Sequence, residues 1–422
     1  MAEPSTDPPF PATVPSARAL LKERDYLLFW TSRWTGAFAA QIQSVAMGWQ
    51  MYAIARATHS VKESSFLVGM IGLAGFIPVF LLTLPAGETA DRYDRRRVLL
   101  VCFAGEIATV LTLAIATSTG HASVALLLAV GFLFGSARAF FNPANTALGP
   151  MLVPRELLPR SIAWNSLAWQ TASIIGPAAG GLLVASSPAY AYFTTFALYG
   201  VAATCTFLIR KNAQPVVNPG SRWELVKEGL AYVWNQKIVF GAISLDLFAV
   251  LLGGATALLP VFARDVLHIG AQGFGLLRSG PAIGATVVAL LLAANPIRSK
   301  AGLFMFAGVA TFGAATCVFA LSRNLALSVA ALAVLGGADM LSVYIRGTLV
   351  QLVTPDAMRG RVAAVSSVFI GASNELGEFE SGVVARFLGP IGAALFGGIG
   401  ALIVTGAWAF LFPALRKADR LE

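Results

Sequence analysis

Charged residues are scarce in this sequence. Asp, Glu, Lys and Arg make up only 12% of its 422 residues, whereas 57% are hydrophobic; an ordinary soluble domain has about 25% charged residues. A soluble fold cannot remove that much apolar surface from water, so the composition indicates that lipid surrounds most of the chain. Apolar runs of roughly 20 residues recur, which is the length that a helix needs to cross a bilayer.

Residues typical of several other protein classes are also missing. The three cysteines each lie inside an apolar run without pairing spacing, so neither a disulfide framework nor a zinc site is indicated. The three histidines fall in expected loops with no nucleophile arrangement around them, and no GxxxxGK[ST] loop is present. We therefore expect neither an enzyme nor an ATP-driven pump, and no metal or cofactor.

The polar ends and the net charge fit a membrane protein. The N-terminal stretch is proline-rich and lacks the apolar core of a cleaved signal peptide, which predicts a disordered cytoplasmic tail over 1–21. The net charge of +9 does not indicate a nucleic-acid partner, because the basic residues form short clusters between apolar runs. We expect membrane lipids around a monomer.

The apolar runs predict an all-α integral membrane protein with twelve transmembrane helices. Their expected limits are 26–55, 65–87, 98–119, 122–143, 162–186, 188–209, 239–263, 272–294, 302–321, 325–348, 362–385 and 389–412. The longest internal polar stretch divides them into two groups of six. We expect an N-terminal bundle over 22–209, a cytoplasmic linker with an amphipathic helix over 210–238, a C-terminal bundle over 239–415 and a tail over 416–422.

The distribution of basic residues predicts the orientation. Most of the 30 Lys and Arg residues fall in the two termini, the linker and every second loop. Because cytoplasmic loops carry the excess of Lys and Arg, both termini are expected in the cytoplasm. The opposite loops hold only Arg56, Lys62, Arg264, Arg323 and Arg386.

The two halves share a weak repeat. A shift of 201 residues aligns PRELLPRSIAWNSLAWQTASIIGPAAGG with PDAMRGRVAAVSSVFIGASNELGEFESG, and places Arg160 on Arg361 and Gly176 on Gly377. Both copies join an inner loop to an odd-numbered span. The repeat predicts two pseudo-symmetric six-helix bundles, an architecture associated with alternating access around a midplane site.

The stretch GETADRYDRRR places seven formal charges directly after an apolar run. It resembles the inner-loop signature of the major facilitator superfamily, roughly G-x-x-x-D-R-x-G-R-R. Thr89 stands where Leu is common, and Asp94 stands where Gly is common; we expect Asp94 to adopt the left-handed backbone that Gly would supply. The matching residues, which we call the cytoplasmic gate, are Gly87, Asp91, Arg92, Arg95 and Arg96.

The resemblance implies that the gate holds the cytoplasmic side shut during transport. Gly87 allows close helix contact, and Asp91 is expected to accept from N–H groups at the start of the eleventh span, where the helix dipole favours an anion. The arginines are expected to bind acidic side chains or carbonyl groups across the inner face. The alternative is that they only anchor the loop against anionic lipid.

The fifth expected span contains GPAAGG, which is similar to the antiporter motif of exporters in this superfamily. We expect its residues Gly176, Pro177, Gly180 and Gly181 to allow tight packing and some bending. The segments ADRYDRRRVLL and LVTPDAMRGRV look most like the bacterial branch that holds the enterobactin exporter and drug and macrolide efflux proteins. The resemblance implies export of a small organic molecule across the inner membrane by proton antiport.

Ionisable side chains in mid-span indicate function, because lipid disfavours them. Glu375 and Glu378 lie three residues apart and share a helix face, whereas Glu380 points elsewhere. Two carboxylates so placed resist simultaneous ionisation, which suits a proton carrier. Asp246 in the seventh span is a further candidate carrier. The alternative for the Glu375 and Glu378 pair is an ion pair with Arg138 or Arg346 that only braces the bundle.

We expect further charges in a central cavity, namely Arg33, Arg138, Asp339 and Arg346. Asp339 and Arg346 are seven residues apart on one face, which favours a pairing within the helix or through a bridging group. The shift of 201 places Arg138 on Asp339 and suggests a salt bridge between the halves. Arg33 and Glu106 also need partners, which the sequence does not identify. Uptake, lipid flipping and sensing stay open as alternatives to export.

Overall fold

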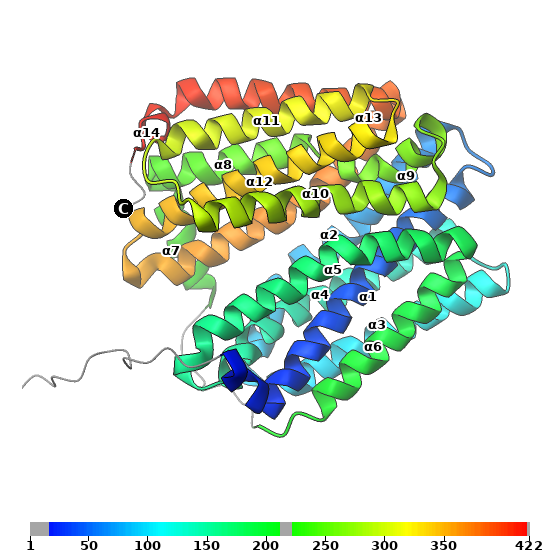
Figure 1. Ribbon diagram of the computed structural model, residues 1–422, viewed down its shortest axis with the longest axis horizontal. Helices are drawn as coiled ribbons and strands as arrows, with labels where there is room; N and C mark the ends of the chain where they lie inside the picture. Colours follow the sequence, from blue (N-terminus) through cyan, green and yellow to red (C-terminus); the bar gives the residue numbers. More distant parts are fainter. Residues whose placement is uncertain (1–16, 212–221, 420–422) are drawn as a thin grey trace, which may run out of the picture.

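The computed structural model describes residues 17–211 and 222–419, and all regular structure within them is helical (Figure 1). The expected tail over 1–21 and the first part of the linker lie largely outside the described residues. The first half contains η1 (Ala17–Lys22), α1 (Arg24–Ala55), α2 (Val61–Arg92), α3 (Arg95–Ser118), α4 (Val124–Leu148), η2 (Gly149–Met151), η3 (Arg155–Leu157), α5 (Leu158–Ser186) and α6 (Pro188–Phe207). Serine side chains at positions 60, 123 and 187 accept backbone N–H groups and so begin α2, α4 and α6.

The second half of the chain repeats this pattern of long helices. It contains α7 (Arg222–Asn235), α8 (Lys237–Leu252), η4 (Ala255–Leu258), α9 (Leu259–Val261), η5 (Phe262–Val266), α10 (Gly270–Ala294), α11 (Ala301–Leu321), α12 (Leu325–Val353), α13 (Asp356–Leu411) and α14 (Pro413–Arg416). Figure 1 shows α1 to α6 gathered in one bundle and α8 to α14 in the other. The expected all-α fold with two bundles is confirmed.

Within the described residues, nine helical segments are long and apolar enough to cross a membrane. Helices α1 and α6 are long but are not among the nine. Helix α13 covers the last two expected spans. The two parts, 356–388 and 390–411, are separated by Gly389, whose φ of +78° is not helical. Glycine tolerates this left-handed backbone, and Pro390 then begins the next helical stretch. The count of twelve spans stays a prediction.

The two bundles meet through α2 against α13 and through α5 against α10. A Cβ atom added at Gly69 would lie 2.7 Å from the Cα of Gly382, and one added at Gly181 would lie 2.8 Å from the Cα of Gly275. Only glycine allows helices to approach so closely. We call the α2–α13 contact around Gly69 and Gly382 the glycine seam.

The contacts between the bundles lie from the middle of the molecule to one end. At that end Tyr52 donates a hydrogen bond to Asp265, and Lys62 Nζ donates to the Phe387 carbonyl at 2.9 Å. The other end, which holds η1, α7 and α14, is called the linker end. The bundles diverge toward the linker end, at the left of Figure 1. This conformation is therefore closed at the end opposite the linker.

The expected amphipathic helix is present as α7, and it packs on the second bundle. Val233 is buried together with Val239 of α8 and Val362 of α13, and Tyr232 donates to the Val353 carbonyl at 3.0 Å. Trp234 touches the Phe240 ring of α8, with 5.0 Å between the ring centroids, but stays 70% exposed. The helix thus has one face on protein and another face open to its surroundings.

Candidate functional site

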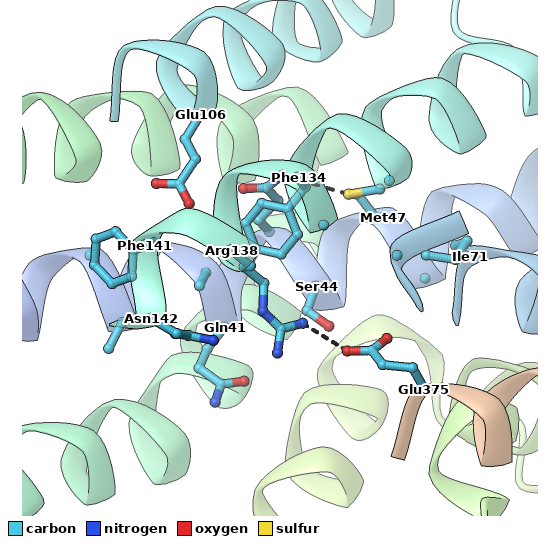
Figure 2. Close-up of a pocket in the computed structure, with 18 of the residues that line it drawn as sticks. Gln41, Ser44, Met47, Ile71, Glu106, Phe134, Arg138, Phe141, Asn142 and Glu375 are labelled. Atoms are coloured by element: carbon cyan, nitrogen blue, oxygen red, sulfur yellow. Dashed lines mark hydrogen bonds and ion pairs between the residues drawn. The ribbon is translucent and has the colours of Figure 1, made fainter. Parts of the chain in front are cut away.

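A cavity of about 490 Å³ lies between the two bundles (Figure 2). Helices α1 to α6 of the first bundle line it, together with η4, α9, α10 and α13 of the second. Apolar groups such as Met47, Phe134 and Phe141 form much of its wall. Its charged lining residues are Arg33, Glu106, Arg138, Arg278, Glu375 and Glu378. A mostly apolar cavity with a few convergent polar groups is typical of a small-molecule site.

Arg138 of α4 and Glu375 of α13 join the two bundles across this cavity. Arg138 Nη1 donates to Glu375 Oε1 at 2.8 Å, and the two side chains are 44% and 18% exposed (Figure 2). Gly75 of α2 leaves room for the contact, since a Cβ atom there would lie 3.4 Å from Glu375 Oε2. The structure thus shows the contact with Arg138 that the sequence offered as the alternative to a proton carrier, and the role of the pair stays a prediction. The expected salt bridge from Arg138 to Asp339 is wrong, because Asp339 lines a separate cavity.

Glu378 lies one helical turn beyond Glu375 and lines the same cavity, as the spacing of the two residues predicts. It also lines the second cavity, of about 380 Å³, so it stands in the wall between the two. The structure shows no ion pair for Glu378 among the residues it describes. Glu380 lines neither cavity and accepts a hydrogen bond from the Ser381 hydroxyl at 3.4 Å.

Asp246 of α8 forms an ion pair with Arg346 of α12 inside the second bundle. Both side chains are buried, with 6% and 7% of their surface exposed. The structure therefore shows Arg346 paired with Asp246 and not directly with Asp339, whereas the pairing with Asp339 through a bridging group stays a prediction. Seven residues of helix span about 10 Å along the axis, which is too far for a direct contact, whereas α8 brings Asp246 alongside. The role of Asp246 as a proton carrier stays a prediction.

Two further contacts between the bundles were not singled out from the sequence. Arg278 Nη2 of α10 donates to the Ser44 hydroxyl of α1 at 3.0 Å. Gln170 Nε2 of α5 donates to the Ala282 carbonyl of α10 at 3.0 Å. Arg278 is an arginine inside an expected span, so the sequence did carry that signal. The serine and glutamine carry no comparable signal, because such residues are common in helices that only pack together.

Glu106 of α3 and Arg33 of α1 both reach the central cavity. Glu106 is only 5% exposed, and its Oε2 atom has no hydrogen-bond partner within the described part of the chain. The Arg33 Nε atom is likewise without a hydrogen bond there. The structure thus brings together four predicted site residues in one cavity, namely Arg33, Arg138, Glu375 and Glu378, and places Asp246, Asp339 and Arg346 outside it. Glu106, for which the sequence indicated only the need of a partner, lines the same cavity.

A family model described as transmembrane secretion effector matches residues 15–422. The chain belongs to this family of major facilitator transporters. Among its relatives, the enterobactin exporter EntS of Citrobacter koseri is 28% identical over 375 residues, which cover 85% of this chain and 86% of the relative. EntS of Escherichia coli O1:K1 is 29% identical over 377 residues, with the same coverage.

Solved transporter structures share the fold. A D-xylose–proton symporter superposes with a TM-score of 0.70 at 11% identity and covers 92% of this chain and 97% of its own. The nucleoside transporter NupG superposes with a TM-score of 0.65 at 16% identity, covering 93% and 98%. At these identities the likeness concerns the fold alone. The transporter is a multi-pass membrane protein similar in sequence to enterobactin exporters.

The gate arginines of this transporter bind within the first bundle. Arg95 Nη1 donates to the Ala147 carbonyl at 3.2 Å, Arg96 donates to the Ile209 carbonyl, and Arg92 pairs with Glu88 at 2.6 Å. The structure shows none of these three arginines bound to the second bundle in the residues it describes. In a conformation that diverges at the linker end this arrangement is expected, so the role of the gate stays a prediction.

Asp94 does not have the backbone expected for it. Its φ and ψ are −56° and 113°, which lie outside the left-handed region. Instead, Asp94 is the N-cap of α3, where Oδ1 accepts from the Arg96 N–H at 2.9 Å. The expected left-handed turn is wrong, because a capping carboxylate is a better replacement for Gly at a helix start than an unusual backbone.

The GPAAGG segment of α5 packs tightly on two helices. A Cβ atom added at Gly176 would lie 2.7 Å from the Cβ of Gln41, and one at Gly180 would lie 3.1 Å from the Cβ of Val45, both in α1. Gly181 faces α10 of the other bundle. Pro177 lies between these contacts inside the helix. Close packing therefore accounts for the three glycines in this conformation.

Proposed function

We propose that this transporter exports a small organic molecule, a siderophore or a drug-like compound, from the bacterial cytoplasm by proton antiport. The observation that carries the proposal is the charged cavity between two bundles that meet at one end and diverge at the other. Cargo is expected to bind there, and the bundles then rock around it. With the orientation that the basic residues predict, the cavity faces the cytoplasm in this conformation.

Cargo binding has a direct way to favour the opposite conformation. The Arg138–Glu375 ion pair joins the bundles across the cavity. A cargo with a polar or anionic group near Arg138 competes for that guanidinium and weakens the contact. A ligand shifts a conformational equilibrium only by its differential affinity for the two states, and this competition supplies such a difference. The EntS relatives are enterobactin exporters, which supports export as the direction of transport.

The energy is expected to come from protons that enter as cargo leaves. One charge that crosses 100 mV carries about 2.3 kcal/mol, which is enough for roughly a fiftyfold concentration gradient. Candidate proton sites in the membrane are Glu375, Glu378 and Asp246, as the sequence predicts. In the structure Glu375 and Asp246 are paired with arginines, whereas Glu378 lines the cavities without an ion pair among the described residues.

Everted inner-membrane vesicles test the proposal. Vesicles with the transporter should accumulate enterobactin or ethidium when an inside-acid pH gradient is imposed, and should lose the accumulated probe when an uncoupler collapses it. The double variant Glu375→Gln, Glu378→Gln should bind the probe but fail to concentrate it. Vesicles that concentrate neither probe, or do so without regard to the gradient, would contradict proton-driven export. Accumulation in right-side-out vesicles instead would indicate uptake.

A further inference from the structure

Glu106 lies at the middle of α3 and has no ion-pair partner among the described residues. It lines the central cavity, yet it is 5% exposed and its Oε2 atom is without a hydrogen bond there. An ionised carboxylate that has lost its water and gained no partner is strongly unfavourable. A proton on the Glu106 carboxyl group removes this cost.

The surroundings of Glu106 include a cation that can stabilise its carboxylate once the proton has left. The charged and titratable groups that act on it are Cys102 on α3 itself, Arg138 on α4 and Tyr199 on α6, and α1 brings Arg33 to the same cavity. Tyr199 donates its hydroxyl to Gln43 Oε1 at 3.2 Å, and Gln43 Nε2 faces the sulfur of Met47. Arg138 is the cation whose charge acts on Glu106 within the described chain.

Arg138 lies between two carboxylates that belong to different bundles. Figure 2 shows its side chain leaving α4 between Glu106 and Glu375, with the guanidinium turned to Glu375. Because α3 and α4 pack against each other in one bundle, Glu106 stays close to Arg138 when the bundles move. Glu375 lies on α13 and moves away from Arg138 when α13 separates from α2.

We propose that Glu106 is the carboxylate that releases and rebinds the coupled proton, and that Arg138 exchanges between Glu375 and Glu106 as the bundles move. The proposal rests on the proton antiport proposed above. When cargo displaces Arg138 from Glu375, Arg138 turns to Glu106. The Glu106 carboxyl group then transfers its proton to water in the cavity, which leads to the linker end. After cargo has left on the opposite side, a proton from that side neutralises Glu106, and Arg138 returns to Glu375.

The exchange predicts that proton binding alone changes the conformation. The full-length transporter, with its three cysteines replaced, is labelled with nitroxides at Leu208→Cys and Leu352→Cys and placed in lipid nanodiscs. These positions are 44% and 51% exposed and lie at the linker ends of the two bundles. Double electron–electron resonance should show a long distance between the two nitroxides at low pH. A population with a short distance should grow as the pH rises. In Glu106→Gln the long distance should persist at every pH.

Two further variants control for folding and for a membrane carboxylate outside the cavities. Glu106→Asp keeps a titrating group and should keep the response with a shifted midpoint, whereas Glu380→Gln, at a residue that lines neither cavity, should respond as the wild type does. A pH response that survives in Glu106→Gln, or is lost in Glu380→Gln, would overturn the assignment. Everted vesicles separate the two proposals. If the wild type and Glu106→Gln both concentrate ethidium in response to the gradient, only the Glu106 assignment fails; if the wild type ignores the gradient, the antiport fails too.

Discussion

Two arginines of this transporter each bind one carboxylate, but their surroundings give the ion pairs different roles. The Asp246–Arg346 pair is buried inside one bundle, and both partners move together with that bundle. The Arg138–Glu375 pair crosses between the bundles, and Arg138 is 44% exposed to the cavity. Removing one partner of a buried pair leaves an uncompensated charge, whereas water and cargo can replace a partner in the cavity. The Asp246–Arg346 pair therefore belongs to the interior of one bundle, whereas Arg138 can exchange its carboxylate partner.

Asp246→Ala should therefore destabilise the transporter strongly. Loss of one partner from a buried ion pair costs about 3–5 kcal/mol, because the remaining Arg346 charge stays buried. The measurement is the thermal unfolding midpoint of the purified protein in detergent. Replacing both partners, with Asp246→Leu and Arg346→Met, should recover most of the loss. Glu375→Ala is the matched control, since a partly exposed pair contributes only about 0–1 kcal/mol. Equal midpoints for Asp246→Ala and the wild type would contradict this interpretation.

At the scale of the helices, the glycine seam decides how closely the bundles meet. Gly69 and Gly382 bring α2 and α13 into backbone contact at the end opposite the linker. The same two helices carry Gly75 and Glu375, so closure of the seam also positions the Arg138–Glu375 contact. Small residues at a helix interface act as a spacing device, because any side chain there sets a larger distance between the backbones.

Gly69→Leu should hold the end opposite the linker open. The new side chain would meet the Gly382 backbone, so the closed seam is no longer accessible. Ser64→Cys reports the change, because Ser64 is fully buried in the closed conformation. A membrane-impermeant maleimide should label this cysteine in intact cells at least tenfold faster in the Gly69→Leu background. Gly105→Leu is the control, since a Cβ atom there meets nothing within 4 Å and should leave labelling unchanged.

The loop between α2 and α3 is expected to act in the opposite conformation. Its gate arginines Arg92, Arg95 and Arg96 bind Glu88 and carbonyl groups of their own bundle in this conformation. Asp91→Asn keeps the shape of the side chain but removes the charge that suits a helix N-terminus. We expect reduced export at normal protein levels. Unchanged export together with unchanged protein levels would exclude the gate role.

At the scale of the whole molecule, η1, α7 and α14 lie at one end (Figure 1). Most of the basic loops are also expected there, which predicts that this end faces the cytoplasm. A cysteine from Trp234→Cys, on the exposed face of α7, should react with an impermeant maleimide only after the cells are permeabilised. A cysteine from His121→Cys, in the loop before α4, should react in intact cells. The reverse pattern would invert the predicted orientation, and the cavity would then face away from the cytoplasm in this conformation.

The sequence by itself determined the features that depend on local pattern. The scarcity of charge and the apolar runs predicted an all-helical membrane protein, because backbone groups in lipid must be satisfied within the helix. The spacing of Glu375 and Glu378 placed both carboxylates on one face, since the helical period alone decides this. The glycines of GPAAGG pointed to close packing for a similar reason.

Only the tertiary structure decided which charges meet. Arg346 pairs with Asp246, although the sequence favoured Asp339 for it. Arg138 pairs with Glu375, whereas the sequence left both Asp339 and the Glu375 and Glu378 pair open as its partners. The helical period shows on which face of its helix a residue lies, but not which other helix packs against that face. The partners on α8 and α13 are distant in the chain from the two arginines. The same limit applies to Glu106. Within the described residues its Oε2 atom has no hydrogen bond, and this follows from how the helices around α3 pack together.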